Sequence, residues 1–302
     1  MHIAQRRCLR ALAAAAALLP GSAGAAAAGA AALGPRAASS GDSGADVAAV
    51  VAAAHRDLGA GARIETVGAF VLAGAPSLSR TGFDHAVDLT RRALVALHAG
   101  RFDASPARPV GVWLFPTAKP YQAWCHARWS ADCISIYGFF LSDERLLVMN
   151  VGPGLGTLTH ELVHPILRAD FPRAPTWIDE GIASLYEAPV IAKPSSIRGI
   201  KNWRLPRLRK ALDAAAERGA ARLDRLFALS DDAFRGDGED LHYALARYFC
   251  QWMDAKGWLW PFYRRWRHDA AADPTGEATF RAVTGLAPAA AHAAFEKWVR
   301  AL

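Results

Sequence analysis

The sequence has few cysteines, little excess charge and no apolar run that could cross a membrane as a helix. Four of the 302 residues are cysteine, and the formal net charge is +7. A membrane-spanning helix needs about 20 consecutive apolar residues, and the run at residues 11–19 is too short. The mild positive charge does not indicate nucleic acid as a partner. With just over half of its residues apolar, the chain is expected to be an ordinary globular protein.

The first 25 residues have the features of a secretory signal peptide. Arg6, Arg7 and Arg10 precede the apolar run, and residues 23–25 supply the small side chains of a cleavage site. Removal of this segment takes away three arginines and no carboxylate, which lowers the net charge from +7 to +4. We therefore expect an exported protein, periplasmic or extracellular, without stable membrane insertion after cleavage. Both the general secretory and the twin-arginine routes stay open.

Export would place the three remaining cysteines in a compartment where disulfides persist. Cys125 and Cys133 are close enough along the chain to form one, with two free thiols as the alternative. Cys250 lies among aromatic residues at helical spacing, so we expect it to be buried and free.

The rest of the chain begins with strands and continues with helices. Residues 26–45 are nearly all Ala, Gly and Ser and predict a flexible tether. Apolar patterning predicts strands at 63–74, 109–117, 134–142 and 145–152, the last two forming a hairpin, and helices at 46–58, 83–100 and 119–129. After Gly152 it predicts helices at 155–168, 178–187, 203–218, 239–256 and 288–301. This order indicates an α+β fold, with subdomains at 46–190 and 191–302.

The segment Thr157–Glu187 carries the strongest chemical signal. His160 and His164 are four residues apart, so on a helix they share one face and can hold one ion. Imidazole pairs suit zinc, which in catalytic sites takes three protein ligands and keeps one position for water. Glu161 lies on the neighbouring flank, where a carboxylate can accept a proton from that water. The run at 169–175 breaks the helix, and a second helix with Thr176 as its cap would return Glu180 as the third ligand.

These residues resemble the gluzincin metallopeptidases of the peptidase MA clan, which include thermolysin- and aminopeptidase N-like enzymes and small exported members. The family shares H-E-x-x-H and then a second helix reading W-[LI]-x-E-G-x-A. The matching residues here are His160, Glu161, His164, Trp177, Ile178, Glu180, Gly181, Ala183 and Glu187.

The resemblance implies a zincin-like fold, in which a mixed sheet and an active-site helix precede a mostly helical part. It makes His160, His164 and Glu180 the ligands of Zn²⁺, and Glu161 the general base. It also implies that the strand at 145–152 is the sheet edge along which an extended peptide would lie. No amine-anchoring motif of the aminopeptidase kind is present, which favours endopeptidase action.

Several assignments around this segment stay open. For the group that stabilises the oxyanion we choose Tyr243, with His242 behind it, although a purely structural Tyr243 is an equal alternative. Asp170 and Asp179 are alternative oxygen ligands. Glu187 is either a hydrogen-bond partner of a ligand histidine or an exposed carboxylate at a helix end.

Two further features have a structural meaning. Pro165 lacks the N–H that would bond the Glu161 carbonyl and allows a kink just after the second ligand. In the aromatic run at 258–269, Trp258, Phe262 and Trp266 fall at helical spacing, which favours a packed helix over a surface for sugars or bases.

Two functional hypotheses follow. In the first, the protein is an exported zinc-dependent metallopeptidase that hydrolyses a peptide or protein substrate with a metal-activated water. In the second, it is a non-catalytic envelope binding module on the same fold. Glu161 favours the enzyme, because the base and all three ligands are present together. The sequence does not fix the substrate or the oligomeric state.

Overall fold

The computed structural model describes residues 40–302, and residues 45–302 form one compact unit. The expected signal peptide and most of the expected tether lie outside the described residues. The first described helix, α2 (Ser40–Leu58), begins inside the expected tether and not at residue 46. None of the described helices is both long enough and apolar enough to pass through a bilayer.

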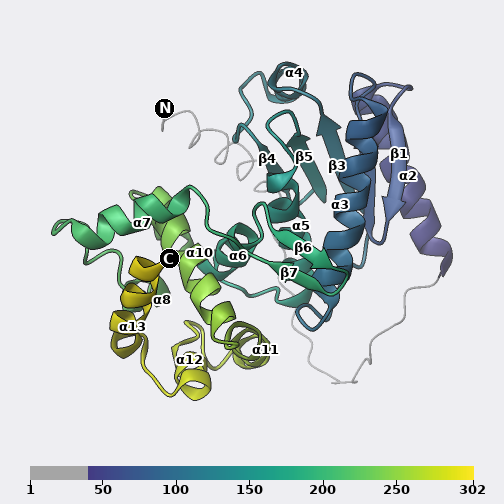
Figure 1. Ribbon diagram of the computed structural model, residues 1–302. Coiled ribbons are helices and arrows are strands. Elements are labelled where there is room, and N and C mark those ends of the chain that lie inside the picture. Colours follow the sequence, from purple (N-terminus) through teal and green to yellow (C-terminus); the bar gives the residue numbers. More distant parts are fainter. Residues whose placement is uncertain (1–39) are drawn as a thin grey trace, which may run out of the picture. The chain divides into compact units, whose positions relative to one another are not determined.

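A five-stranded mixed sheet forms the first half of this unit (Figure 1). Its strands are β1 (Arg63–Val67), β2 (Phe70–Gly74), β3 (Val110–Phe115), β4 (Gly138–Leu141) and β5 (Leu146–Asn150), in the order β1-β2-β3-β5-β4. β2, β3 and β5 are parallel, and the outer strands β1 and β4 are antiparallel to their neighbours. The single strand expected at 63–74 is in fact the β1–β2 hairpin, because Gly68 turns the chain with a φ of 59°.

The expected hairpin of β4 and β5 is confirmed, but the expectation that the strand at 145–152 forms the sheet edge is wrong. β5 pairs with β3 on one side and with β4 on the other, so β4 is the edge strand. The burial of the two strands explains this order. Every residue of β5 is buried, as suits an interior strand, whereas Phe140 and Leu141 of β4 are partly exposed.

Helices cover both faces of the sheet. Alternate strand residues such as Leu72, Val112 and Leu147 share a core with α3 (Arg80–His98) and α5 (Gly156–Asp170). The intervening residues, including Trp113 and Val148, pack against α2 and α4 (Ala118–Trp129). The expected disulfide between Cys125 and Cys133 is present and ties α4 to the loop before β4. Cys250 is buried and free, as expected.

The second half is helical except for one hairpin that the sequence did not indicate, β6 (Val190–Lys193) with β7 (Ser196–Arg198). Its helices are α6 (Thr176–Leu185), α7 (Arg204–Asp213), α8 (Leu223–Phe227), α9 (Asp231–Phe234), α10 (Glu239–Ala255), α11 (Leu259–Asp269), α12 (Glu277–Thr284) and α13 (Pro288–Ala301). The helix expected at 203–218 ends early, where Ala214 adopts an extended backbone. Phe262 and Trp266 on α11 are fully buried, which confirms the packed helix.

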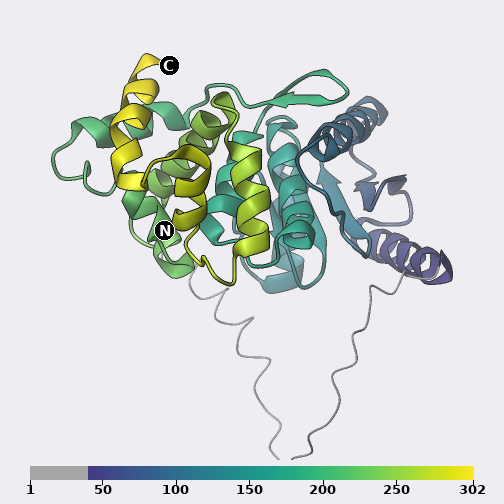
Figure 2. The same ribbon diagram turned by 90° about the horizontal axis from the view of Figure 1, so that it is seen from below.

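α6 lies at the centre of the molecule, between the sheet half and the C-terminal helices (Figures 1 and 2). It packs against α5 on one side and against α10 on the other. One hydrophobic core continues from Val67 on β1 to Val299 on α13, so residue 190 does not separate two cores. The two-helix segment expected from the motif therefore occupies the junction between the two halves.

The α5–α6 turn differs from expectation in one detail. Thr176 is the first helical residue and not the cap, because Pro175 takes the cap position with an extended backbone. The backbone N–H of Thr176 donates to Asp231 Oδ1 at 2.7 Å, so α9 satisfies the start of α6. Helix α5 remains helical on both sides of Pro165.

We predict that the Cys125–Cys133 bridge contributes to stability. The bridge closes a loop with a sequence separation of 8, and the chain-entropy account gives about 2–3 kcal/mol for a loop of this size. A protein with both cysteines changed to Ser should show this loss in urea unfolding. A reductant should destabilise the natural protein and leave the double variant unchanged; equal stability of the two proteins without reductant would contradict the prediction.

Candidate metal centre

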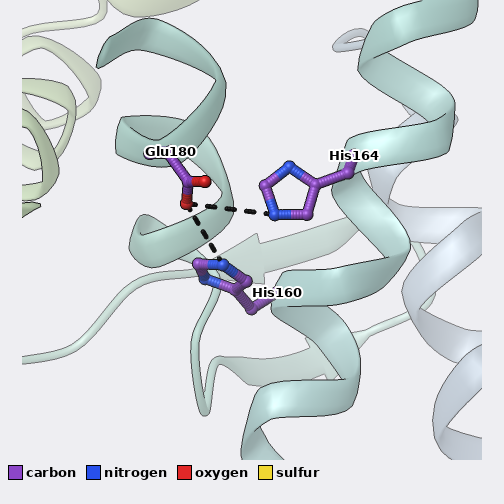
Figure 3. A group of neighbouring side chains, drawn as sticks. All are labelled: His160, His164 and Glu180. Carbon is purple, nitrogen blue, oxygen red and sulfur yellow. Dashed lines mark ion pairs between the residues drawn. The ribbon is translucent and has the colours of Figure 1, made fainter. Parts of the chain in front are cut away.

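His160 and His164 on α5 face Glu180 on α6 (Figure 3). Glu180 Oε2 lies 3.4 Å from His160 Nε2 and 3.9 Å from His164 Nε2, and one donor atom from each of the three side chains lies within 4.8 Å of the others. The imidazole rings are 5.0 Å apart between centroids, one helical turn from each other. The spacing expected for a ligand pair on one helix face is therefore confirmed, and the turn after α5 brings Glu180 to the same point.

The donor set and its surroundings suit a metal ion. All three side chains are buried, and within residues 40–302 the Glu180 Oε2 atom makes no hydrogen bond. A buried carboxylate oxygen that makes no hydrogen bond is costly unless a cation or a charged side chain compensates it. Ligand atoms about 2.0–2.2 Å from a tetrahedral ion lie about 3.4 Å apart, which matches the separation between Glu180 and His160; the 3.9 Å between Glu180 and His164 is longer. The His160, His164 and Glu180 cluster can thus hold a metal ion.

Asp179 orients one of the two histidines. Its Oδ1 lies 2.8 Å from His164 Nδ1, which leaves His164 Nε2 directed at Glu180. This is how a carboxylate typically fixes the ring of a metal-binding histidine. Asp179 is therefore the hydrogen-bond partner of His164. It does not take the place of Glu180 as a ligand, which was the alternative considered from the sequence. His160 differs, because its buried Nδ1 has no hydrogen-bond partner among the described residues.

The other two carboxylates considered from the sequence have structural contacts. Asp170 accepts hydrogen bonds from the backbone N–H groups of Asp103 and Ala104 and from the Tyr263 hydroxyl, so it anchors the end of α5 and is not a ligand. Glu187 does not contact a ligand histidine. It is buried and accepts hydrogen bonds from Asn202 and Arg204. Both expected alternatives, a partner of a ligand histidine and an exposed carboxylate at a helix end, are therefore wrong.

Glu161 lies beside the cluster but outside the group of donor atoms. Burial raises the pKa of Glu161 above the usual carboxyl value. The nearby His160 and His164 lower this pKa, and the charges of Glu180 and Asp179 raise it. The Glu161 side chain makes no hydrogen bond among residues 40–302. A carboxylate with a raised pKa next to a metal site is suited to accept and return a proton.

The ligands stabilise each other's charges. Burial alone would lower the pKa of His164, but Asp179 and Glu180 outweigh it and raise this pKa to about 10. Burial would raise the pKa of Glu180, but His164, His160 and Arg235 hold it well below the usual range. Glu180 is therefore ionised at any physiological pH, as a metal ligand must be.

Arg235 and Tyr243 complete the surroundings of Glu180. Arg235, just after α9, donates from Nη2 to Glu180 Oε1 and from Nη1 to the Tyr243 hydroxyl oxygen. Burial and the nearby Glu180 raise the pKa of Tyr243 well above its usual value, with Arg235 opposing them. Tyr243 thus keeps its proton, and the structure places it next to the third ligand, as expected.

His242 does not share this position. Its Nδ1 lies 3.0 Å from the Phe234 carbonyl oxygen, and its ring lines a separate cavity of about 390 Å³ with Arg225, Leu226 and Leu245. Neighbouring residues on a helix point in directions about 100° apart, so Tyr243 and His242 cannot both face Glu180. His242, which the sequence offered behind Tyr243 for the oxyanion, therefore lies away from Glu180.

Sequence reasoning missed Arg235 and the role of Asp179. Arg235, Glu239 and Tyr243 are spaced by four residues, and Arg235 Nη1 also lies 3.5 Å from Glu239 Oε1. A spacing of four residues would indicate one helix face, but α10 begins only after Gly238, so Arg235 does not lie on the same helix as Glu239 and Tyr243. Asp179 directly precedes Glu180, and the spacing alone does not distinguish the carboxylate that contacts His164 Nδ1 from the one that faces both Nε2 atoms.

No family model and no curated protein matches the chain. The fold and the site define an α+β protein with a mixed sheet, a helical C-terminal part and a buried cluster of two histidines and one glutamate that can hold a metal ion.

We predict that Asp179→Asn weakens metal binding by about 10- to 100-fold, because it removes the carboxylate that orients His164. Competition with a coloured chelator measures the affinity. Asp213→Asn is the matched control, since Asp213 is exposed and pairs with Arg300 away from the cluster. Equal affinity of the two variants would show that Asp179 does not orient a ligand.

Proposed function

We propose that this protein is an exported zinc-dependent peptidase. The observation that carries the proposal is the convergence of His160, His164 and Glu180 on one point, with a buried carboxylate, Glu161, beside them. Two imidazoles and one carboxylate form a common donor set of catalytic zinc, which leaves one position open for water. The Cys125–Cys133 disulfide supports export, because such bonds persist in oxidising compartments.

Zinc in this cluster would polarise the scissile carbonyl and lower the pKa of a water molecule. The chain's own groups supply the remaining steps. Glu161 accepts the proton of the attacking water and returns it to the leaving amine. Tyr243 would donate its hydroxyl hydrogen to the developing oxyanion, while its oxygen accepts from Arg235.

The edge of the sheet supports a peptide as the substrate. β4 has one unpaired edge and packs beside α5, so an extended peptide can add to it as a further strand. The loop before β4 is held by Tyr121, whose hydroxyl donates to the Ser135 carbonyl oxygen. Burial raises the pKa of Tyr121, and the charge of Glu161 raises it further. Ile136 and Tyr137 in this loop are exposed and could contact substrate side chains. Endopeptidase action, expected from the sequence, remains part of the proposal.

We predict about one zinc per chain in the purified protein and much less in Glu180→Ala, measured by elemental mass spectrometry. Glu161→Gln should keep the zinc and the fold but lower peptide hydrolysis by at least about 100-fold, since it removes only the proton acceptor. Full hydrolysis by the Glu161→Gln variant would refute the base assignment. Absence of zinc after reloading would instead favour the binding-module hypothesis.

We further predict that Tyr243→Phe lowers kcat by about 100-fold with little change in KM or zinc content, because the lost hydrogen bond forms mainly in the transition state. Tyr248→Phe on the same helix is the control, since its hydroxyl contacts Asn202 and not Glu180. An unchanged kcat in Tyr243→Phe would leave Tyr243 as a structural residue.

A further inference from the structure

Two arginines from different elements flank Tyr243. The guanidinium carbon of Arg204, at the start of α7, lies 4.8 Å from the centre of the Tyr243 ring. That of Arg235 lies 5.5 Å from the same centre. Arg235 contacts Glu180 directly, whereas Arg204 contacts the Tyr243 ring on the same side of the site.

Arg204 has unused hydrogen-bonding capacity. Its Nε pairs with Glu187 at 3.4 Å, while its Nη1 and Nη2 make no hydrogen bond among the described residues and are not among the buried polar atoms. The side chain is 21% exposed. A guanidinium group offers its donors as a planar fork, which matches the two oxygens of a carboxylate.

The charges on this side of Tyr243 favour an anion. Arg247 on α10 is fully buried, and this burial lowers the pKa of its guanidinium group; Tyr248 and Glu187 oppose the shift, and the nearby Arg204 adds to it. Arg204 pairs with Glu187, whereas Arg247 forms no ion pair with a carboxylate among residues 40–302 and donates to the Ile200 carbonyl oxygen. Arg235 is matched by Glu180 and Glu239, but a metal ion bound to Glu180 would take up much of that carboxylate's charge.

Trp203 adds an apolar contact at the same place. It is 59% exposed, and its ring centre lies 5.8 Å from the Arg204 guanidinium carbon. An exposed tryptophan that is held beside an arginine offers a stacking surface for the part of a ligand next to its charge.

We propose that Arg204 and Arg235, with Trp203, form a subsite for a carboxylate of the substrate close to the bond that is cleaved. This proposal rests on the peptidase function proposed above and narrows its substrate class. The carboxylate can be the C-terminus of a peptide or the side chain of an Asp or Glu residue. Both sources present the same planar pair of oxygens to Arg204.

Peptide binding tests the subsite without requiring catalysis. The zinc-loaded Glu161→Gln protein is titrated calorimetrically with two pairs of peptides: one pair differs only in a C-terminal acid or amide, the other only in an internal Glu or Gln. We expect at least one carboxylate peptide to bind about tenfold or more tightly than its neutral partner, as one charged hydrogen-bonded contact can provide. The pair that shows the difference identifies the source of the carboxylate.

Variants of Arg204 then assign the effect. Arg204→Gln, made in the Glu161→Gln background, should abolish the preference, and Arg204→Lys should keep part of it because the charge remains. Arg92→Gln is the control of equal charge, since Arg92 is exposed on α3 and pairs with Asp88. Thermal unfolding of each variant checks that the fold is retained.

Three results would overturn the subsite: equal affinities within both peptide pairs, a preference that survives Arg204→Gln, or no binding of any peptide. These results are distinct from failure of the proposed function. If the unaltered protein hydrolyses the two members of each peptide pair equally well, in both pairs, the peptidase function stands and the subsite falls. If it hydrolyses none but the variant retains an Arg204-dependent preference, the subsite stands as a binding site and the peptidase function falls.

Discussion

The structure around the site depends on one buried negative charge, that of Glu180. Transfer of a carboxylate from water into a protein interior costs several kcal/mol unless partners compensate it. Here the compensation is divided between the two oxygens: Oε2 faces His160 and His164, and Oε1 accepts from Arg235. The same charge thus ties α6 to α5 on one side and to the segment after α9 on the other. It also explains why Tyr243, which shares Arg235 with Glu180, lies at the site.

Close packing of α6 holds that charge in place. A Cβ atom on Gly181 would lie 2.8 Å from Cys250 Sγ and 3.0 Å from the Ala246 carbonyl oxygen, so only glycine allows α6 to approach α10 this closely. The glycine that follows Glu180 in the motif therefore has a packing reason, which is independent of the chemistry. On the opposite side α6 meets α5, and the short turn at residues 171–175 limits how far the two helices can separate. A rigid central helix is a good support for a ligand, because a small displacement of Glu180 would open the triad.

The sequence predicted the parts of the site that depend on local spacing. His160 and His164 follow from the period of a helix, and Glu180 follows from a turn of limited length and a recognisable second helix. The parts that depend on contacts between distant elements were missed or misplaced. Arg235 contacts Glu180 across a separation of 55 residues, and the spacing of the sequence did not indicate it. His242, named after Tyr243 for the oxyanion, instead lies beside the Phe234 carbonyl oxygen. In the fold, the α+β order, the β4–β5 hairpin and most helices were predictable, but the position of β5 inside the sheet was not, because apolar patterning does not state which strand is outermost. The β6–β7 hairpin was missed since its strands are short and largely exposed.

The two histidines are not equivalent, and the difference bears on what a bound ion does. Asp179 fixes the ring of His164 before any ion arrives. Among the described residues His160 has no such partner at its buried Nδ1, and its Nε2 faces Glu180 Oε2 at 3.4 Å. Neither His160 Nδ1 nor Glu180 Oε2 makes a hydrogen bond within residues 40–302, and a buried polar atom without one costs stability. An ion bound by this cluster would compensate the charge of the Glu180 oxygen. Metal binding would therefore raise the free energy of unfolding through Glu180, which lies at the junction of the two halves of the molecule.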